Sequence, residues 1–314
     1  MLSVEFEQLT RPAAEALEHM TFPAYRHLLS LAPSPRHPEQ GDRRPIQPLA
    51  IAASVGGSSV GLVLVETPLE DTRPPEMLSL YVCPELRNHG VGTTLVGRGE
   101  AAVRERGFAR VETVYMNGKP GIAALEHVLE KREWSPPITR TITVRFTPEE
   151  AARTPWFGRL TLPSDEFQIF QWTALRPDER AELIRSHEES GWIAKGLEPW
   201  RHDRYGFDPV SSLGLRYRGT VVGWVINHRI APDTVRFTCS FMRRDLSRRG
   251  RILPLYTESI RRLGEIGCTI CTFVTPVFHK EMVEFINRRC ARWISFVGET
   301  RGSAKRLEVV SKAG

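Results

Sequence analysis

The chain has 314 residues, of which 41% are hydrophobic, so it is long enough for about two domains with packed cores. No segment approaches the roughly 20 continuous apolar residues of a transmembrane helix, and the first residues lack the basic and apolar regions of a signal peptide. Five cysteines, an odd number in a long chain, favour a reducing compartment over a disulfide framework. We therefore expect a cytoplasmic protein without a membrane segment.

The N-terminal part of the chain predicts strands and one long loop. Residues 32–48 are rich in proline and charge, which indicates a mobile loop near the mouth of the first domain. Residues 49–54 and 60–66 are apolar runs separated by Gly56-Gly57-Ser58-Ser59, which is typical of a β-hairpin.

A glycine-containing turn between a strand and a helix is the most informative motif. The apolar run 77–82 is followed by Arg87-Asn88-His89-Gly90-Val91-Gly92 and then by an amphipathic stretch, 93–106. Glycines let backbone N–H groups approach an anion, and the helix N-terminus adds partial positive charge. The spacing differs from a Walker A loop, which needs a lysine, and from a dinucleotide fingerprint, which needs a third glycine.

Arg-x-x-Gly-x-Gly between a strand and a helix resembles the GCN5-related N-acetyltransferases (the GNAT superfamily), which use acyl-CoA. The context continues over residues 60–140: Gly107 is typical of a helix C-cap, 110–117 of a strand, 121–131 of a helix and 139–146 of a last strand. The resemblance implies that the strand before the turn pairs with the pantetheine arm and that the turn holds the pyrophosphate. The cofactor-binding positions it implies are Leu80, Tyr81, Val82, Arg87, Asn88, His89, Gly90, Val91, Gly92 and Thr93.

Catalytic side chains are also implied by the resemblance. Many family members place a glutamate near the start of the strand before the turn, which here is Glu76, with Glu66 and Glu112 as rivals. The family's usual tyrosine, a proton donor in the last helix, is replaced by Leu129. Either Tyr115 or His127 takes that role, or the thiolate leaves unassisted. Asn117 matches the polar residue that commonly ends the family's fifth strand.

The second half of the chain reads as a second copy of the first. Prolines and acidic residues interrupt the helical and strand periodicity between residues 147 and 164. The net charge also changes there: residues 1–150 carry 16 Lys and Arg against 19 Asp and Glu, whereas residues 151–314 carry 27 Lys and Arg against 18 Asp and Glu. The order of strands and helices repeats at about 160 residues. Aligning Gly250 with Gly90 places Ser247 at the position of Arg87 and Ile252 at that of Gly92, so we expect the second copy to bind CoA poorly or not at all.

Three further features leave alternatives open. The basic run from Arg243 to Arg251 is either a site for an acidic partner or a solvated loop; nucleic acid is not expected, since no recognised motif accompanies the charge. An aromatic and basic cluster either shapes an acceptor site or caps the second core: Trp192, Trp200, His202, Arg204, Tyr205 and Phe207. Cys268 and Cys271 are read as buried packing residues rather than as a redox or metal pair, and no metal is implied.

These patterns together predict an α/β protein of two tandem GNAT-like domains, each a mixed, mostly antiparallel sheet flanked by helices. Residues 1–150 would bind acetyl-CoA or a longer acyl-CoA and transfer the acyl group directly to an amine of a small molecule or peptide, with Glu76, Tyr115 and Asn117 as catalytic candidates. Residues 151–314 would be a degenerate copy with a structural or acceptor-binding role. The alternatives are a non-catalytic acyl-CoA-binding regulator and an interaction protein whose basic half binds an acidic partner.

Overall fold

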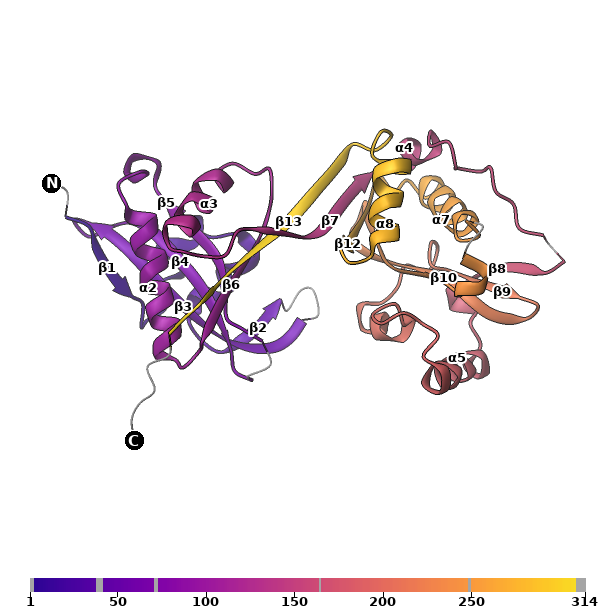
Figure 1. The fold of residues 1–314 in the computed structure, drawn as a ribbon, viewed down its shortest axis with the longest axis horizontal. Coiled ribbons are helices and arrows are strands. Elements are labelled where there is room, and N and C mark those ends of the chain that lie inside the picture. The colour runs from indigo at the N-terminus through magenta and orange to yellow at the C-terminus, as the bar shows by residue number, and fades with distance from the viewer. Residues whose placement is uncertain (1–2, 38–41, 71–72, 164, 248–249, 309–314) are drawn as a thin grey trace. The chain divides into compact units, whose positions relative to one another are not determined.

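The computed structural model describes residues 3–37, 42–70, 73–163, 165–247 and 250–308, and it divides the chain into two compact units. Unit 1 comprises Met1–Arg140 and Glu299–Gly314, and unit 2 comprises Thr141–Gly298 (Figure 1). This division differs from the expected one, because residues 141–150 join the second unit and the C-terminal residues from Glu299 join the first.

Unit 1 is built on a sheet with the strand order β1-β3-β4-β5-β6-β13, and β2 pairs with β3. Neighbouring strands are antiparallel except β5 and β6, which are parallel. The strands are β1 (Glu5–Gln8), β2 (Ser34–His37), β3 (Asp42–Val55), β4 (Ser58–Pro68), β5 (Glu76–Val82), β6 (Arg110–Met116) and β13 (Phe296–Arg306).

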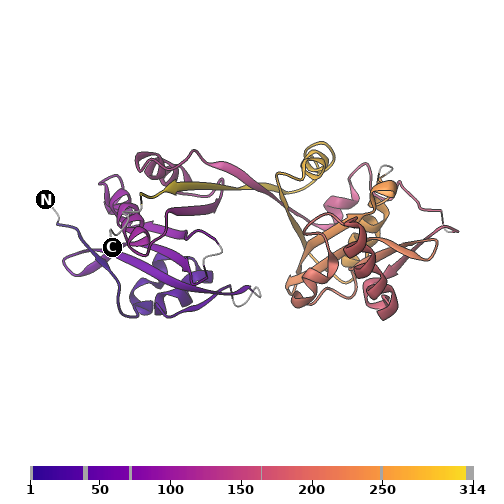
Figure 2. The same cartoon turned by 60° about the horizontal axis from the view of Figure 1, so that its bottom comes forward.

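Helices cover both faces of the unit 1 sheet, and the sequence of β4 shows why. Val63 and Val65 join the apolar cluster under α2, whereas Leu62 and Leu64 alternate to the opposite cluster, which contains Leu28. Figure 2 shows helix α2 and the indigo helical turns of residues 14–30 on opposite faces. The helical segments are α1 (Ala14–Leu17), η1 (Glu18–Met20), η2 (Pro23–Ser30), η4 (Pro84–Leu86), α2 (Val91–Glu105) and α3 (Ile122–Lys131).

The loop expected at residues 32–48 is largely a strand pair. β2 pairs with the start of β3, where Pro35 faces Pro45, and residues 38–41 lie outside the described part. Residues before Ile46 pair with β2 but not with β4, so Pro45 does not interrupt a ladder on both sides. Proline content therefore suggested a loop where the chain forms an edge hairpin.

Unit 2 repeats this architecture with the strand order β7-β12-β11-β10-β9-β8, and only β11 and β12 are parallel. Its strands are β7 (Ile138–Phe146), β8 (Phe167–Gln171), β9 (Leu213–Tyr217), β10 (Thr220–Ala231), β11 (Thr234–Met242) and β12 (Ile270–Pro276). Its helical segments are α4 (Pro148–Ala152), η5 (Trp172–Ala174), α5 (Pro177–Ser190), η6 (Pro199–Tyr205), α6 (Arg244–Ser247), α7 (Leu253–Glu265), α8 (Lys280–Phe285) and η7 (Ile286–Cys290).

Each unit completes its sheet with a strand that follows the last helix of the other unit in sequence. β7 follows α3 but pairs with β12, and β13 follows α8 and η7 but pairs with β6. The prediction of two mixed, mostly antiparallel α/β sheets is confirmed, although the last strands are exchanged in sequence. None of the helices in the described residues is long and apolar enough to cross a membrane.

Candidate functional site

In unit 1, strands β5 and β6 separate after a short stretch of pairing. The parallel ladder joins Glu76 to Glu112 and Met77 to Thr113, and then ends. On the other side of β5 the register with β4 shifts by one residue at Leu78, which is the signature of a β-bulge. The bulge turns the end of β5 away from β6, so the backbone from Leu78 onwards offers hydrogen-bonding groups on its β6 side to a ligand in extended conformation.

The glycine turn lies directly after this separated strand end. Asn88 and Gly90 have left-handed backbone conformations, with φ of 64° and 81°, and α2 begins at Val91. The first N–H groups of an α-helix have no acceptor within the helix, and they carry the positive end of its dipole. The turn therefore presents N–H groups from residues 90–93 as an anion site at the end of β5.

Two side chains shape the turn. Arg87 is exposed, and its Nε donates to the carbonyl oxygen of Val82 at 3.1 Å, which leaves its terminal nitrogens for an anion. His89 Nδ1 lies 2.7 Å from the carbonyl oxygen of Arg87; a carbonyl only accepts, so Nδ1 carries the proton. The His89 side chain thus stabilises the turn, and only its backbone N–H is available to an anion.

Gly92 has an ordinary backbone conformation and sits against the strand end. A Cβ added there would lie 3.6 Å from Val82 and Val128 and 3.7 Å from Leu80. Alanine therefore fits, whereas a longer side chain would fill the space between α2 and the implied pantetheine positions Leu80 and Val82. Tyr81 points to the opposite face, where its ring meets His19 edge to face with centroids 6.1 Å apart.

The three glutamates considered as bases lie side by side across three strands, since Glu66 faces Glu76 and Glu76 faces Glu112. Glu66 is fully buried and forms an ion pair with Arg73. Glu112 forms ion pairs with Arg110 at 2.7 Å and Arg140 at 3.0 Å. Glu76 begins β5, two residues before the bulge, which places it closest of the three in sequence to the separated strand end.

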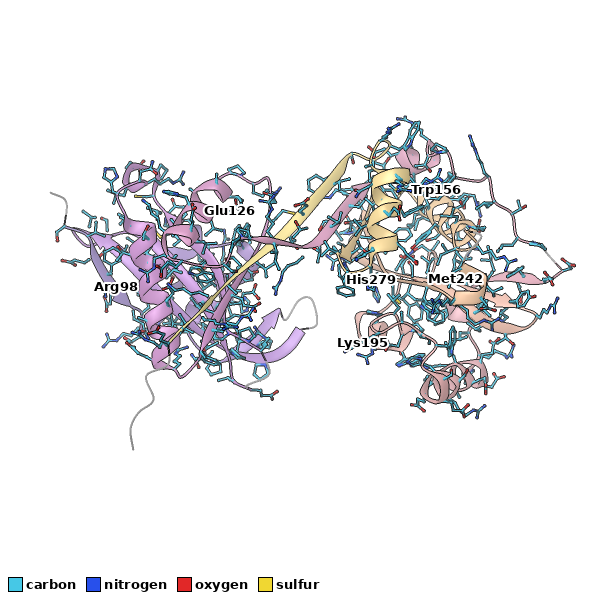
Figure 3. The ribbon with its side chains drawn as sticks, viewed as in Figure 1. Arg98, Glu126, Trp156, Lys195, Met242 and His279 are labelled. Carbon is cyan, nitrogen blue, oxygen red and sulfur yellow. The ribbon has the colours of Figure 1, made fainter. Side chains whose placement is uncertain are left out.

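Tyr115 is engaged with α3. Its hydroxyl donates to Glu126 at 2.9 Å, and Arg301 also binds this carboxylate, at 3.2 Å; Figure 3 labels Glu126. Burial and the Glu126 carboxylate raise the pKa of Tyr115, so the hydroxyl stays protonated at neutral pH. The other proposed donor, His127, is exposed on α3 within 4.0 Å of Glu130. Leu129, which stands where the resemblance implies a tyrosine, is buried in the core.

Asn117 follows β6 and closes the next turn on itself. Its side-chain oxygen accepts from the Gly118 N–H at 2.9 Å, and its backbone N–H donates to Glu299 at 2.7 Å. The hydrogen bonds of its side-chain oxygen therefore serve the local turn.

Unit 2 contains the same bulge and separation without the glycine turn. The parallel ladder of β11 and β12 ends at Phe237 and Phe273, and the register with β10 shifts at Thr238. These positions are 160 residues after Met77, Thr113 and Leu78, which matches the offset between Gly90 and Gly250. α7 begins with Leu253-Pro254 after Ile252, so one of its first N–H groups is missing. The position of Arg87 is taken by Ser247, whose hydroxyl donates to the carbonyl oxygen of Arg244 at 2.9 Å.

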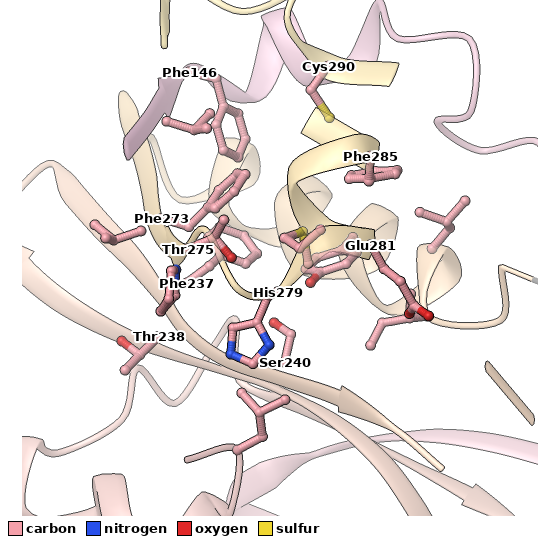
Figure 4. A pocket seen from close by; sticks show the side chains of 18 of the residues that line it. Phe146, Phe237, Thr238, Ser240, Phe273, Thr275, His279, Glu281, Phe285 and Cys290 are labelled. Atoms are coloured by element: carbon pink, nitrogen blue, oxygen red, sulfur yellow. The ribbon is translucent and has the colours of Figure 1, made fainter. Parts of the chain in front are cut away.

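The separated strand ends of unit 2 border a pocket of about 830 Å³, which the sequence patterns did not indicate. Figure 4 shows Phe146, Phe237 and Phe273 gathered at one end, and Thr238, Ser240 and His279 at the other. The aromatic residues Phe237 and Phe273, where the two parallel strands separate, are the sequence signal that could have suggested it.

The structure places the aromatic cluster and part of the basic run of unit 2. Trp192, Trp200 and Phe207 pack against the core cluster around Trp224, which favours the core-capping interpretation; the side chains of Arg204 and Tyr205 lie outside the described part. In the basic run, Arg243 pairs with Asp245 at 2.8 Å, and residues 248–249 are not described.

Cys268 and Cys271 are both buried free thiols, and the Cys268 thiol donates to the carbonyl oxygen of Asp233 at 3.3 Å. The described residues contain no group of three or more His, Cys, Asp or Glu side chains placed to hold a metal ion.

Comparison with known proteins gives a family match over part of unit 1 and a shared fold over most of the chain. The model of the acetyltransferase (GNAT) family matches residues 14–129. The sequence matches none of the curated proteins.

Solved structures share the fold over nearly the whole chain. A tandem GNAT protein from the clavulanic acid biosynthesis pathway is 15% identical and has a TM-score of 0.57, over 97% of this chain and 98% of that one. The glucosamine N-acetyltransferase region of a fungal multi-domain β-N-acetylglucosaminidase is 14% identical with a TM-score of 0.57, over 97% of this chain and 38% of that one. A GCN5-related N-acetyltransferase from Sphaerobacter thermophilus is 17% identical with a TM-score of 0.51, over 82% and 81%.

Proposed function

We propose that unit 1 is an acyl-CoA-dependent N-acyltransferase, because residues 14–129 match the model of the acetyltransferase (GNAT) family and the chain shares its fold with a tandem GNAT protein. The observation that carries this proposal is the junction of β5 and α2. A strand with a free backbone edge leads directly into a turn that presents helix N-terminal N–H groups and an exposed arginine. An acyl-CoA has a matching order of parts, namely an amide-containing arm followed by a pyrophosphate.

Each part of the cofactor has a partner at this junction. The pantetheine amides would pair with the backbone of Leu80, Tyr81 and Val82, whose β6 side is open. The pyrophosphate would lie on the N–H groups of the turn, with the Arg87 guanidinium as counter-charge. The cofactor positions proposed are residues 80–82 and 87–93, and the cofactor is acetyl-CoA or a longer acyl-CoA.

The chemistry is direct transfer to an amine. A protonated amine must lose a proton before it attacks the thioester carbonyl, and Glu76 is the proposed base, acting directly or through water. The tetrahedral oxyanion would be stabilised by a backbone N–H of the separated strand β5. The bond to sulfur then breaks, and CoA leaves as the thiolate.

Tyr115 is the catalytic candidate that would protonate the leaving thiolate. Its raised pKa keeps the proton on the hydroxyl at neutral pH, but that proton is directed at Glu126. Tyr115 can serve as an acid only after this hydrogen bond breaks, so we propose that departure of the thiolate depends little on it. Asn117 stabilises the turn after β6, so we propose that it positions this turn and does not take part in proton transfer.

Unit 2 would not bind acyl-CoA, because Ile252 and Ser247 replace Gly92 and Arg87 of the proposed anion site in unit 1. Its proposed roles are structural support or binding of the acceptor, which is an amine on a small molecule or peptide. Binding of an acidic partner at the run from Arg243 to Arg251 remains a second proposal for unit 2. Within this run, Arg243 already forms an ion pair with Asp245.

A non-catalytic acyl-CoA-binding regulator is the second candidate function. The observation that favours it is the loss of the family's tyrosine at Leu129 together with the engagement of Tyr115. Both candidates require acyl-CoA binding in unit 1, so turnover separates them.

The test is release of CoA from acetyl-CoA and longer thioesters in the presence of a panel of amines and peptides. The proposal predicts amine-dependent CoA release that is lost in Arg87→Glu. Tight acyl-CoA binding without release by any amine would support the regulator, and absence of binding would refute both.

A further inference from the structure

The pocket in unit 2 lies where the family's fold opens between its two parallel strands, but its surroundings differ from those in unit 1. It is bordered by Thr238 and Ser240 from β11, by Thr275 from β12, and by residues of α7 and α8. Its volume of about 830 Å³ falls in the range of about 300–1,000 Å³ that is usual for small-molecule sites. All residues that line the pocket belong to unit 2.

In unit 2, the position that corresponds to the glycine turn of unit 1 is closed to a phosphate group. Ile252 and Leu253 are themselves part of the pocket wall, so apolar side chains stand where the glycine turn of unit 1 presents N–H groups. A ligand of this pocket is therefore not held through a pyrophosphate.

The interior of the pocket is apolar and aromatic. Phe146, Phe237 and Phe273 are joined by Tyr256, Met282 and Phe285 in its wall. Phe278 and Val274 continue this lining to the surface, where they are 72% and 43% exposed. Exposed apolar side chains that continue a pocket wall are typical of binding sites, because water contacts there are lost favourably when a ligand enters.

At the other end, the hydroxyl of Thr238 is oriented by His228, which lies behind the pocket wall. His228 Nε2 lies 3.2 Å from the carbonyl oxygen of His202, which only accepts, so Nε2 carries the proton. His228 Nδ1 therefore accepts from the Thr238 hydroxyl, 2.8 Å away, and the lone pairs of the Thr238 oxygen remain available. Such groups suit a neutral polar atom of the ligand, since burying an unpaired charge beside them would be costly.

Charges occur where the pocket meets solvent. Lys195 and Lys280 are exposed members of the lining, and neither ammonium has an ion-pair partner among the described residues. His279 is half-buried, and Glu281 is the exposed acidic member. Figure 3 labels Lys195 and His279 on this side of unit 2. The mouth thus carries two lysines against one carboxylate.

We propose that the unit 2 pocket is a binding site for an apolar monocarboxylate, with its hydrocarbon body among the aromatic side chains and its carboxylate at the mouth near Lys195 and Lys280. The apolar wall excludes a charged group from the interior, and the lysine excess at the mouth favours an anion over a cation. This site is additional to the proposed acyl-CoA site of unit 1.

The test is calorimetric titration of the full chain, kept saturated with CoA, with octanoate, octylamine and 1-octanol as probes that share one hydrocarbon tail. The proposal predicts one octanoate per chain and an affinity for octylamine at least about tenfold lower. Equal or tighter binding of octylamine would overturn the charge assignment, and absence of octanoate binding would overturn the site.

Two matched variants locate the binding. Val274→Trp should fill the mouth and weaken octanoate binding by more than about tenfold, whereas Ile230→Trp changes a similarly exposed apolar residue of unit 2 outside the pocket and should have no effect. Lys280→Glu should weaken octanoate by about three- to tenfold and leave 1-octanol unchanged. Unchanged octanoate binding in Val274→Trp, or equal loss in Ile230→Trp, would refute the location.

Discussion

The two strand-to-helix turns of this chain occupy equivalent places in the two units but differ in what they can bind. In unit 1, Gly90 takes a left-handed conformation and α2 opens on Val91-Gly92-Thr93 with its N–H groups free of side-chain cover. In unit 2, Gly250 also has a positive φ, but Ile252 and Pro254 follow it. The backbone conformation at this glycine is thus retained in unit 2, where the residues of the proposed anion site are replaced.

The comparison extends along the helices that follow. Glu100 in α2 is buried and accepts hydrogen bonds from Arg132 at 2.6 Å, Trp134 at 2.8 Å and Lys305 at 3.0 Å. The residue 160 positions later, Ile260 in α7, is simply part of the unit 2 core and of its pocket wall. Unit 1 therefore uses a buried ion network where unit 2 uses an apolar contact.

The largest expected effect concerns the base. Glu76→Gln should slow acyl transfer by about 10²-fold or more without changing acyl-CoA affinity, because only proton removal is lost. The matched control is Arg236→Gln, at the equivalent position of unit 2, where His228 faces Arg236 as Glu66 faces Glu76. Steady-state turnover of both variants tests this, and a turnover of Glu76→Gln equal to that of the wild type would remove Glu76 from the mechanism.

Next in size is the ion network. Glu100→Ala should lower the free energy of unfolding of unit 1 by about 3 kcal/mol, because Arg132 and Lys305 lose their shared partner. Ile260→Val in unit 2 should cost about 1 kcal/mol. Hydrogen exchange of the α2 and α7 amides would report each unit separately, and unchanged exchange in α2 of Glu100→Ala would contradict the assignment.

The same network predicts an acid dependence. Burial opposes ionisation of Glu100, but hydrogen bonds from Arg132, Trp134 and Lys305 outweigh it and lower the pKa of Glu100 below its usual 4.5. A depressed pKa gives stabilisation that is present above pH 4.5 and is lost as pH falls through the folded-state value. The stability difference between wild type and Glu100→Ala should therefore shrink in acid, as denaturation curves at pH 7 and pH 3 would show.

A smaller effect tests the anion site in both units. Arg87→Glu should weaken acetyl-CoA binding by about 10- to 100-fold, since a cation beside the pyrophosphate becomes an anion. Ser247→Glu places the same charge at the equivalent position of unit 2 and should leave the affinity unchanged. Titration calorimetry measures both, and a loss confined to Ser247→Glu would mean that unit 2 is the cofactor domain.

The smallest effect concerns His228. Burial lowers the pKa of His228 below its usual 6.5, and the neighbouring His202 carbonyl only partly offsets this. The neutral ring therefore contributes stability that is full above pH 6.5 and is lost as pH falls towards the folded-state value. Between pH 7.5 and 5.5 the wild type should lose more thermal stability than His228→Gln; an equal loss would contradict the neutral assignment.

Much of the fold could be predicted from the sequence because the motifs that indicate it are short and local. Arg-x-x-Gly-x-Gly, the apolar runs and the 160-residue offset predicted the strands around the turn, the second copy and the degeneracy at Ser247 and Ile252. Backbone conformation at Gly90 depends on that residue and its neighbours, so a short motif is sufficient to predict it.

Features that depend on pairing between distant segments could not be predicted in the same way. β7 and β13 have strand composition, but composition does not say which sheet they join. The bulges at Leu78 and Thr238, the Tyr115–Glu126–Arg301 contact and the unit 2 pocket depend on register and packing. The loop predicted around Pro45 was wrong for the same reason, because the effect of a proline on a strand depends on whether that strand pairs on one side or on both.

The central claim is that unit 1 alone binds acyl-CoA, and native mass spectrometry of the full chain with CoA thioesters from acetyl to long-chain tests it most directly. One CoA thioester per chain, retained in Ser247→Glu and lost in Arg87→Glu, is the predicted result. Two per chain, or one that Arg87→Glu does not remove, would contradict it.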